Sequence, residues 1–524
     1  MFEVPSRQLL HGETPSQPYQ RGVATKFGRF LGGNPGMQKQ CRNTPPNFFS
    51  THPVAVFPSP HRPATAETKT TYSHKTMFRI ASRTAAAPAR GAGKTRSFAT
   101  VSPVTGATRS HKVVVVGGGT GGICASHQLL RSGRFAQDDI AIVDPASHHH
   151  YQPGWTLVGG GLKTAEEQEK PMKELVDPKF KFYNNGVKSL NPEENLVTLE
   201  SGDKVSYEHL ILAPGIKIDY SSIKGLPEAL ADKSSLVSTI YGRDTVPKVF
   251  STIQSLKQGT AIFTQPVGVV KCAGAPQKIM WMALDHWKRA GLYDGSNPST
   301  SPINISFATG LPVMFGVPKY AATLERLRKE RGVEGLFQHD LVEVNSGNVA
   351  TFALPDGKGT VTKKFDLMHV VPKMGPHAFV KSSALVDATG FIDVDQATTR
   401  SKRFGNVWAI GDATNLPTAK TAAAITAQSP VLVGNLLRVM DGKDGGELTY
   451  DGYTSCPLIT SYDKVLLAEF KYGGQPKETF GKLVDQSEPN RAFYHLKKDF
   501  FPWVYQNYMV KGKWGGPKGW ISKP

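Results

Sequence analysis

The sequence predicts an α/β protein made of two Rossmann-like dinucleotide-binding domains, the second nested within the first, and a C-terminal segment suited to a membrane interface. The apolar run KVVVV (112–116) is typical of a strand buried in a parallel sheet. A glycine-rich hexapeptide, 117–122, and a helical pattern to about Ser132 follow it. A strand, a helix and a strand recur in the same order over 259–310. Because this alternation is typical of parallel sheets covered by helices, both segments predict Rossmann-like units.

The first unit carries the pattern of a dinucleotide-binding loop. Gly117, Gly119 and Gly122 have the spacing G-x-G-x-x-G between the strand and the helix. Such glycines permit a tight turn and a close approach of the backbone to a pyrophosphate, which lies at the helix N-terminus. The next predicted strand, IAIVD, ends in Asp144, whose carboxylate is expected to accept hydrogen bonds from ribose hydroxyl groups. These four residues predict a dinucleotide site.

Two later segments indicate which dinucleotide binds. YEHLILAPG (207–215) is a predicted strand ending in a small-residue turn, and 403–428 combines a strand, the pair Gly411-Asp412 and an alanine-rich helix. Both resemble signatures of two-dinucleotide-fold flavoproteins. That resemblance implies FAD, with Asp412 at its ribityl-phosphate region and the helix N-terminus directed at the isoalloxazine, whose reduced form carries negative charge. NAD at the first site is the alternative, but it leaves the Gly-Asp segment unexplained.

The second unit, expected over 245–388, lacks the features of a nicotinamide site. If it bound NAD(P)H, a G-x-G-x-x-G loop would follow the strand AIF (261–263), and an acidic residue would end the strand INISF (303–307). The chain reads TQPVGVVKCAGAP and ATGLPVMFG at these places. We therefore expect the electrons to come from another donor.

The cysteines suggest a different chemistry. Cys41 lies in the N-terminal region that precedes the first predicted strand, and Cys124 lies in the first predicted helix, where a small packed residue is expected. Cys272 lies in a Gly/Ala/Pro-rich loop beside Lys271 and just before a helix, and both a cation and a helix N-terminus lower a thiol pKa. Cys456 lies in a turn-rich segment, and its distance from Cys272 along the chain leaves open whether the two meet.

Four segments carry a more specific resemblance, to the mitochondrial-type sulfide:quinone oxidoreductases, which are membrane-associated flavoproteins. They are VKCAGAPQKIM (270–280), HYQPGWTLVGGG (150–161), GDATNLPTAKTAAA (411–424) and YDGYTSCPL (450–458). The similarity extends from about residue 110 to the C-terminus. It implies that Cys272 and Cys456 are the two redox-active cysteines. A third cysteine, which some members carry after the Gly-Asp pair, is Ala413 here.

The resemblance also implies a reaction. Hydrogen sulfide attacks an oxidised Cys272–Cys456 bridge at Cys456, which keeps the sulfur as a persulfide, and Cys272 leaves as a thiolate beside the flavin. A small acceptor such as glutathione or sulfite removes the sulfur, and two electrons pass through FAD to ubiquinone. Lys420 is expected either to stabilise charge at the flavin or to be a solvated helix lysine.

Two other functions remain open at this point. One is a type II NADH:quinone dehydrogenase, which the missing second glycine loop disfavours. The other is a non-enzymatic flavin-bearing redox sensor or scaffold, because a fold does not determine a function.

The N-terminal region is expected to be a mitochondrial transit peptide or a disordered leader over 1–108. Its first 100 residues hold 14 Lys and Arg against Glu3, Glu13 and Glu67, and they are rich in Ser, Thr, Pro and Ala. The leader therefore carries much of the formal net charge of +19, which argues against nucleic acid as a partner. We expect a mitochondrial location.

The C-terminal region is expected to contact the inner mitochondrial membrane, because a quinone acceptor dissolves in lipid. Residues 491–520 interleave aromatic residues, which suit the headgroup depth, with lysines, which suit anionic lipid. Four of these lysines are Lys497, Lys498, Lys511 and Lys513. Because Pro502 interrupts a single helix, two short amphipathic segments are expected. The alternative is an aromatic helix packed on its own domain.

The predicted organisation has four parts after the leader. The FAD-binding domain comprises 109–244 and 389–440, the second Rossmann-like domain 245–388, and the C-terminal region with the second redox cysteine 441–524. The three histidines at 148–150 do not predict a metal site, because adjacent side chains point in different directions. The oligomeric state is left open.

Overall fold

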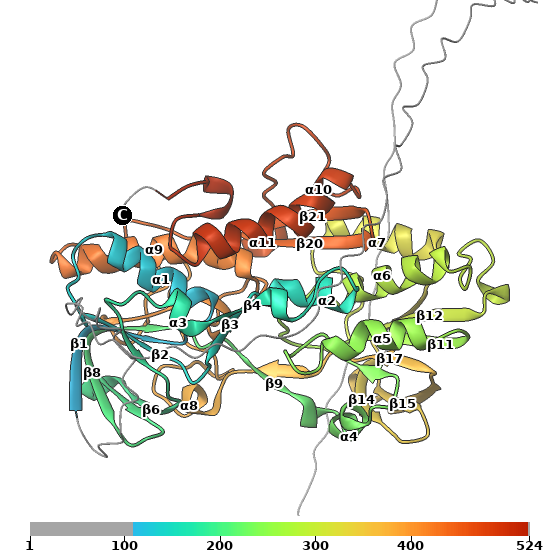
Figure 1. The fold of residues 1–524 in the computed structure, drawn as a ribbon, viewed down its shortest axis with the longest axis horizontal. Helices are drawn as coiled ribbons and strands as arrows, with labels where there is room; N and C mark the ends of the chain where they lie inside the picture. Colours follow the sequence, from blue (N-terminus) through green and yellow to red (C-terminus); the bar gives the residue numbers. More distant parts are fainter. Residues whose placement is uncertain (1–107, 522–524) are drawn as a thin grey trace, which may run out of the picture. The chain divides into compact units, whose positions relative to one another are not determined.

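The structure is a computed structural model that describes residues 108–521, so the expected leader lies outside the described residues except for its last position. Within this part, two dinucleotide domains lie beside each other and a C-terminal helical segment runs along one side of them (Figure 1). None of the described helices is both long enough and apolar enough to cross a membrane.

The first dinucleotide domain is built on a sheet with the strand order β5-β2-β1-β8-β7-β6, in which β19 also pairs with β8. Its strands are β1 (Thr108–Val116), β2 (Ile140–Val143), β5 (Lys181–Tyr183), β6 (Val187–Asn191), β7 (Leu196–Leu199), β8 (Lys204–Leu212) and β19 (Val407–Ala409). β1 is central and parallel to both neighbours, with Val113 opposite Ile140 on β2 and His209 on β8. Residues 113–116 are buried because apolar clusters cover both faces of the sheet.

Two helices cover one face of this sheet. α1 (Thr120–Arg131) starts directly after the glycine loop, and α9 (Ala422–Met440) follows β19. Their apolar side chains pack with those of β1 and β2 in one cluster. Both N-termini therefore lie at the carboxyl edge of the parallel strands, which is where open α/β sheets bind their ligands.

The second dinucleotide domain has a five-stranded parallel sheet with the order β10-β17-β11-β12-β13. Its strands are β10 (Val237–Ser238), β11 (Gly259–Gln265), β12 (Ile303–Thr309), β13 (Glu334–Phe337) and β17 (Leu367–His369). Its main helices are α5 (Pro247–Ser255), α6 (Ala275–Arg289) and α7 (Pro318–Glu330). The first strand of this sheet precedes residue 245, the expected start of the domain.

The chain passes between the domains through two short antiparallel strands, β9 (Lys217–Asp219) and β18 (Lys373–Gly375). β9 follows the last long strand of the first sheet, and β18 returns the chain toward β19. The second domain is therefore inserted into the first, as predicted.

The C-terminal region differs from the prediction in two respects. Cys456 lies on β20 (Thr454–Ser461), which forms a hairpin with β21 (Lys464–Lys471), and not in a turn-rich segment. A continuous helical run over 491–509, named here the C-terminal run, replaces the two expected short segments.

The C-terminal run consists of α10 (Arg491–His495), a π-helical turn (Leu496–Phe500), α11 (Phe501–Val504) and a second π-helical turn (Tyr505–Met509). The π-turn before α11 widens the helix where Pro502, which has no N–H group, follows, so the run continues past the proline. Phe493 and Tyr494 pack in the core of the second domain, and Tyr505 and Met509 pack in that of the first. The run thus joins both domains.

Candidate functional site

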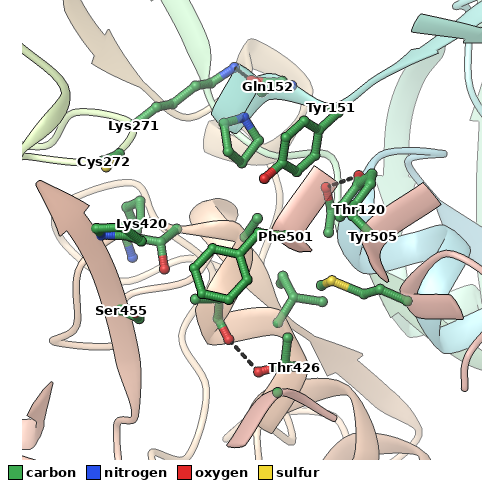
Figure 2. Close-up of a pocket in the computed structure, with 18 of the residues that line it drawn as sticks. Thr120, Tyr151, Gln152, Lys271, Cys272, Lys420, Thr426, Ser455, Phe501 and Tyr505 are labelled. Atoms are coloured by element: carbon green, nitrogen blue, oxygen red, sulfur yellow. Dashed lines mark hydrogen bonds between the residues drawn. The ribbon is translucent and has the colours of Figure 1, made fainter. Parts of the chain in front are cut away.

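A cavity of about 460 Å³ lies between the two domains and the C-terminal run, and four of the predicted site residues line it: Gly119, Cys272, Asp412 and Lys420. Figure 2 shows Cys272 and Lys420 on one side of it and Thr120 and Tyr505 on the other. The glycine loop, the cysteine loop before α6, the N-terminus of α9, β20 and the C-terminal run all contribute to its wall.

The glycine loop has the geometry that a pyrophosphate requires. A Cβ atom at Gly122 would collide with the Gly117 carbonyl oxygen, and Gly117 itself has a φ of +101°. Gly119 caps α1 and lines the cavity, and a Cβ there would meet no atom within 4 Å. The backbone of the loop is therefore open toward the cavity at the N-terminus of α1.

Asp144 lies at the end of β2, beside the glycine loop but outside the cavity wall. Its carboxylate oxygens accept hydrogen bonds from the backbone N–H groups of Gly118, at 2.6 Å, and Ala146, at 2.7 Å. Burial nevertheless raises its pKa. The carboxylate thus fixes the shape of the loop, and its contact with a ribose stays a prediction.

Asp412 and Lys420 lie on the cavity wall contributed by the segment between β19 and α9. Burial raises the pKa of Asp412, against the opposing charges of Lys271 and Lys420. Lys420 is buried and its Nζ donates to the carbonyl oxygens of Thr414, at 2.6 Å, and Leu416, at 3.3 Å. The alternative of a solvated helix lysine is therefore wrong: burial lowers the pKa of Lys420 to about 8.

The cavity fits FAD. The open glycine loop can hold the pyrophosphate, and Asp412 presents a carboxylate for the hydroxyl groups of the ribityl chain. α9 starts after Thr421, whose side chain caps it, and Thr421, Ala422 and Ala423 line the cavity. A helix N-terminus at this point stabilises the negative charge of a reduced isoalloxazine.

The two candidate redox cysteines meet although they are far apart in the sequence. The Sγ atoms of Cys272 and Cys456 are 3.2 Å apart. Cys272 has a φ of +55°, its N–H donates to the Lys420 carbonyl oxygen at 2.8 Å, and its carbonyl oxygen accepts from Ala275. The loop is thus bonded both to the segment before α9 and to the first turn of α6, and Cys272 lines the cavity.

Gly274 was not predicted as a site residue, yet it makes the approach of Cys456 possible. Cys456 is only 1% exposed on β20, which packs against α6. A Cβ atom at Gly274 would lie 2.5 Å from Cys456 Sγ and would also collide with Leu458. The glycine in the sequence CAG is the signal that a second chain segment comes close there.

The cation beside Cys272 is Lys278 and not the expected Lys271. Lys278, on the buried face of α6, donates from Nζ to Cys272 Sγ at 3.4 Å. Lys271 instead donates to Gln152 Oε1 at 3.1 Å. The sequence does not predict the role of Lys278, because a lysine in an amphipathic helix normally faces solvent.

A second buried lysine comes from the C-terminal run. Lys497, expected at the lipid surface, is 2% exposed and donates to the Pro153 carbonyl oxygen at 2.8 Å. Burial, together with repulsion from Lys278, lowers its pKa to about 7. The assignment of Lys497 to lipid is therefore wrong, because the run turns this side chain toward the cysteines.

These groups make the two thiols unequal. The hydrogen bond from Cys456 and the positive charges of Lys278 and Lys497 hold the pKa of Cys272 well below its usual range, although burial opposes them. The same hydrogen bond and burial raise the pKa of Cys456. Burial by itself would lower the pKa of Lys278, but the two sulfurs outweigh it and raise that pKa. Cys272 is thus the thiolate of the pair.

The remaining candidates have structural positions. Cys124 is buried in α1, where its Sγ donates to the Met509 carbonyl oxygen at 3.2 Å and burial raises its pKa. His149 is buried and hydrogen-bonded, and His150 lies 3.3 Å from Glu169. Across residues 108–521 no group of His, Cys, Asp and Glu side chains has the arrangement of a metal site.

Comparison with known proteins identifies the family. The model for pyridine nucleotide-disulphide oxidoreductases matches residues 111–249. The mitochondrial sulfide:quinone oxidoreductase of Schizosaccharomyces pombe is 47% identical over 436 residues, which cover 79% of this chain and 93% of that protein. The protein of the same name from Dictyostelium discoideum is 43% identical over 410 residues, or 77% and 87% of the two chains.

A solved structure supports the same fold. The X-ray structure of the sulfide:quinone oxidoreductase from Aquifex aeolicus aligns with a TM-score of 0.62 at 17% identity, covering 76% of this chain and 92% of that chain. The predicted fold class, the FAD cofactor and the mitochondrial location are confirmed by these comparisons. This chain belongs to the family of mitochondrial sulfide:quinone oxidoreductases.

Proposed function

We propose that this chain oxidises hydrogen sulfide at the pair Cys272 and Cys456 and transfers two electrons through FAD to ubiquinone. The distance of 3.2 Å between the two sulfurs, at the wall of a cavity that fits FAD, carries the proposal. We further propose that Gly117, Gly119, Gly122, Asp144, Asp412 and Lys420 hold the cofactor.

The inequality of the thiols supports a direction of attack. In the oxidised enzyme the cysteines form a bridge, and HS⁻ attacks the sulfur whose partner is the better leaving group. A thiol of lower pKa leaves faster, so Cys272 departs as a thiolate and Cys456 becomes the persulfide. One S–S bond forms and one breaks, so this step consumes no electrons. Lys278 and Lys497 stabilise the thiolate that is released.

The sulfur must then leave the enzyme. A small nucleophile, glutathione or sulfite, attacks the outer sulfur of the Cys456 persulfide and leaves Cys456 as a thiolate. The two buried lysines supply a positive field for such an anionic acceptor. Re-formation of the bridge from two thiolates releases two electrons, and FAD held in the cavity would supply the two-electron acceptor between the thiolates and the quinone.

The apolar side of the cavity suits the quinone ring. The C-terminal run contributes Phe500, Phe501, Tyr505 and Met509 to the wall, and Trp514 follows. Phe501 extends into the cavity opposite the segment that carries Lys420 (Figure 2). This wall and the N-terminus of α9, where the isoalloxazine is proposed to bind, border the same cavity.

We propose that the enzyme docks on the membrane with the face that carries the C-terminal run. The large exposed apolar side chains of this region are Leu483 (88% exposed), Trp520 (59%), Trp503 (47%) and Phe500 (37%). Figure 1 shows the C-terminal run, the loop before α10 and the final segment on the same side of the described chain. Leu483 lies outside the predicted 491–520 segment and extends the lipid-facing surface to this loop.

The test compares electron donors. Sulfide, mixed anaerobically with the enzyme in a stopped-flow instrument, should bleach the absorbance of the oxidised flavin. NADH at the same concentration should leave that absorbance unchanged. Decylubiquinone should then restore the absorbance. Bleaching by NADH with no response to sulfide would replace the proposal by the type II dehydrogenase, and a flavin that responds to neither would support the redox sensor.

A further inference from the structure

A chain of buried hydrogen bonds joins the C-terminal run to the glycine loop. The Tyr505 hydroxyl lies 2.7 Å from His149 Nε2 and 2.7 Å from Thr120 Oγ1. His149 Nδ1 lies 2.9 Å from the Gly118 carbonyl oxygen. His149 and Tyr505 are both buried. Figure 2 shows the contact between Thr120 and Tyr505 at the edge of the cavity.

Chemistry assigns a direction to each of these bonds. A carbonyl oxygen only accepts, so His149 Nδ1 carries the proton that is donated to Gly118. Burial lowers the pKa of His149 to about 4, so the imidazole is neutral and its Nε2 accepts from the Tyr505 hydroxyl. The Tyr505 oxygen can then accept only from Thr120. Each hydrogen bond in the chain therefore has one donor and one acceptor without conflict.

The hydrogen bonds hold the residues on both sides of Gly119, which is the residue with open space for a pyrophosphate. Gly118 precedes Gly119, and Thr120 is the first residue of α1. Thr120 and Tyr505 also line the cavity, and the Tyr505 ring packs on that of Tyr151 with centroids 4.5 Å apart. A residue 385 positions away along the chain thus fixes the loop that faces the cofactor.

We propose that Tyr505 is a positioning residue that holds the glycine loop in its FAD-binding shape through His149 and Thr120. The C-terminal run thereby controls how long the enzyme keeps FAD, in addition to its contact with lipid. The inference rests on FAD as the cofactor and is independent of the sulfide chemistry proposed for the cysteines.

The test measures the release of FAD from the purified holoenzyme. Tyr505→Phe keeps the ring but removes two hydrogen bonds, and we expect FAD to dissociate about tenfold faster, followed by the rise of free-flavin fluorescence after dilution. Tyr508→Phe is the matched control, because Tyr508 belongs to the same π-turn and packs edge-on against Trp520, outside the chain of hydrogen bonds. Its release rate should equal that of the parent.

Three further variants separate positioning from general packing. Thr120→Val should accelerate FAD release as Tyr505→Phe does, whereas Thr120→Ser, which keeps the hydroxyl group, should release FAD at the parent rate. The double variant Thr120→Val/Tyr505→Phe should release FAD no faster than Tyr505→Phe alone, because both changes break the same chain of hydrogen bonds. Any of three results would overturn the proposal. They are equal release rates for Tyr505→Phe and Tyr508→Phe, additive effects of Thr120→Val and Tyr505→Phe, and faster release from Thr120→Ser than from the parent.

Discussion

Replacement of Lys278 by methionine isolates the electrostatic origin of the Cys272 thiolate. Lys278 Nζ lies 3.4 Å from Cys272 Sγ, and both residues line the cavity, Lys278 buried and Cys272 partly buried. Methionine has a similar length and no charge, so it fills the same space and leaves no new buried cation unpaired. The substitution removes the donor nearest to the thiolate.

The expected magnitude follows from the value of a hydrogen bond to a charged group, about 1.5–3 kcal/mol. This corresponds to about tenfold to hundredfold in the ratio of thiolate to thiol at a fixed pH. The lower end is expected, because Lys497 remains and loses the repulsion from Lys278 that lowers its pKa. The sign is fixed: Lys278 lowers the pKa of Cys272, so its loss raises that pKa and the thiolate forms only at higher pH.

The assay is the rate of alkylation of Cys272 by iodoacetamide in the dithiol form of the enzyme, measured from pH 5 to 10 and quantified by mass spectrometry. In Lys278→Met the rise of the rate with pH should move to higher pH than in the parent. Lys288→Met is the control, because Lys288 lies on the same helix and is exposed. If the profile of Lys278→Met coincides with that of the control, Lys278 does not stabilise the thiolate and the electrostatic reasoning is wrong.

Three other substitutions test the site and its surface. In Cys456→Ser, the rate at which sulfide reduces the flavin, measured by stopped flow, should fall by orders of magnitude at unchanged FAD content, because no bridge remains for sulfide to open. The control Cys124→Ser should keep the parent rate. A normal rate in Cys456→Ser would contradict the role of Cys456. Gly274→Ala should lower the free energy of unfolding in urea by about 1–3 kcal/mol and slow the formation of the Cys272–Cys456 disulfide, because the new Cβ atom collides with Cys456 Sγ. An unchanged rate of disulfide formation would show that β20 moves to accommodate the Cβ atom. Trp503→Ser should reduce the binding affinity for anionic liposomes, measured by sedimentation, about fivefold. Val313→Ser is the control, because Val313 is similarly exposed but lies in the second domain, and its binding should equal that of the parent. Equal binding of the two variants would exclude the proposed membrane face.

Short stretches of sequence were sufficient for the parts of the fold that local patterns encode. The run KVVVV predicts a buried parallel strand because only a strand covered on both faces is apolar at every position, and β1 has this environment. The glycine spacing at 117–122 predicts the phosphate loop, because two of these glycines leave no room for a Cβ atom. The absence of a second glycine loop after β11 likewise predicts a second domain without a nicotinamide site.

The chemistry around the sulfurs was decided by tertiary structure. Cys456 lies within reach of Cys272 because the hairpin of β20 and β21 packs against α6, a contact between segments that share no local pattern. The sequence of α6 and of the C-terminal run shows lysines, but not that Lys278 and Lys497 face inward. Whether an ammonium group is hydrated or buried beside a thiolate depends on what packs over it. The same packing therefore decides how strongly the ammonium group lowers the pKa of Cys272. Residue type supplies the charge, whereas the surrounding fold sets the dielectric and the distance through which that charge acts.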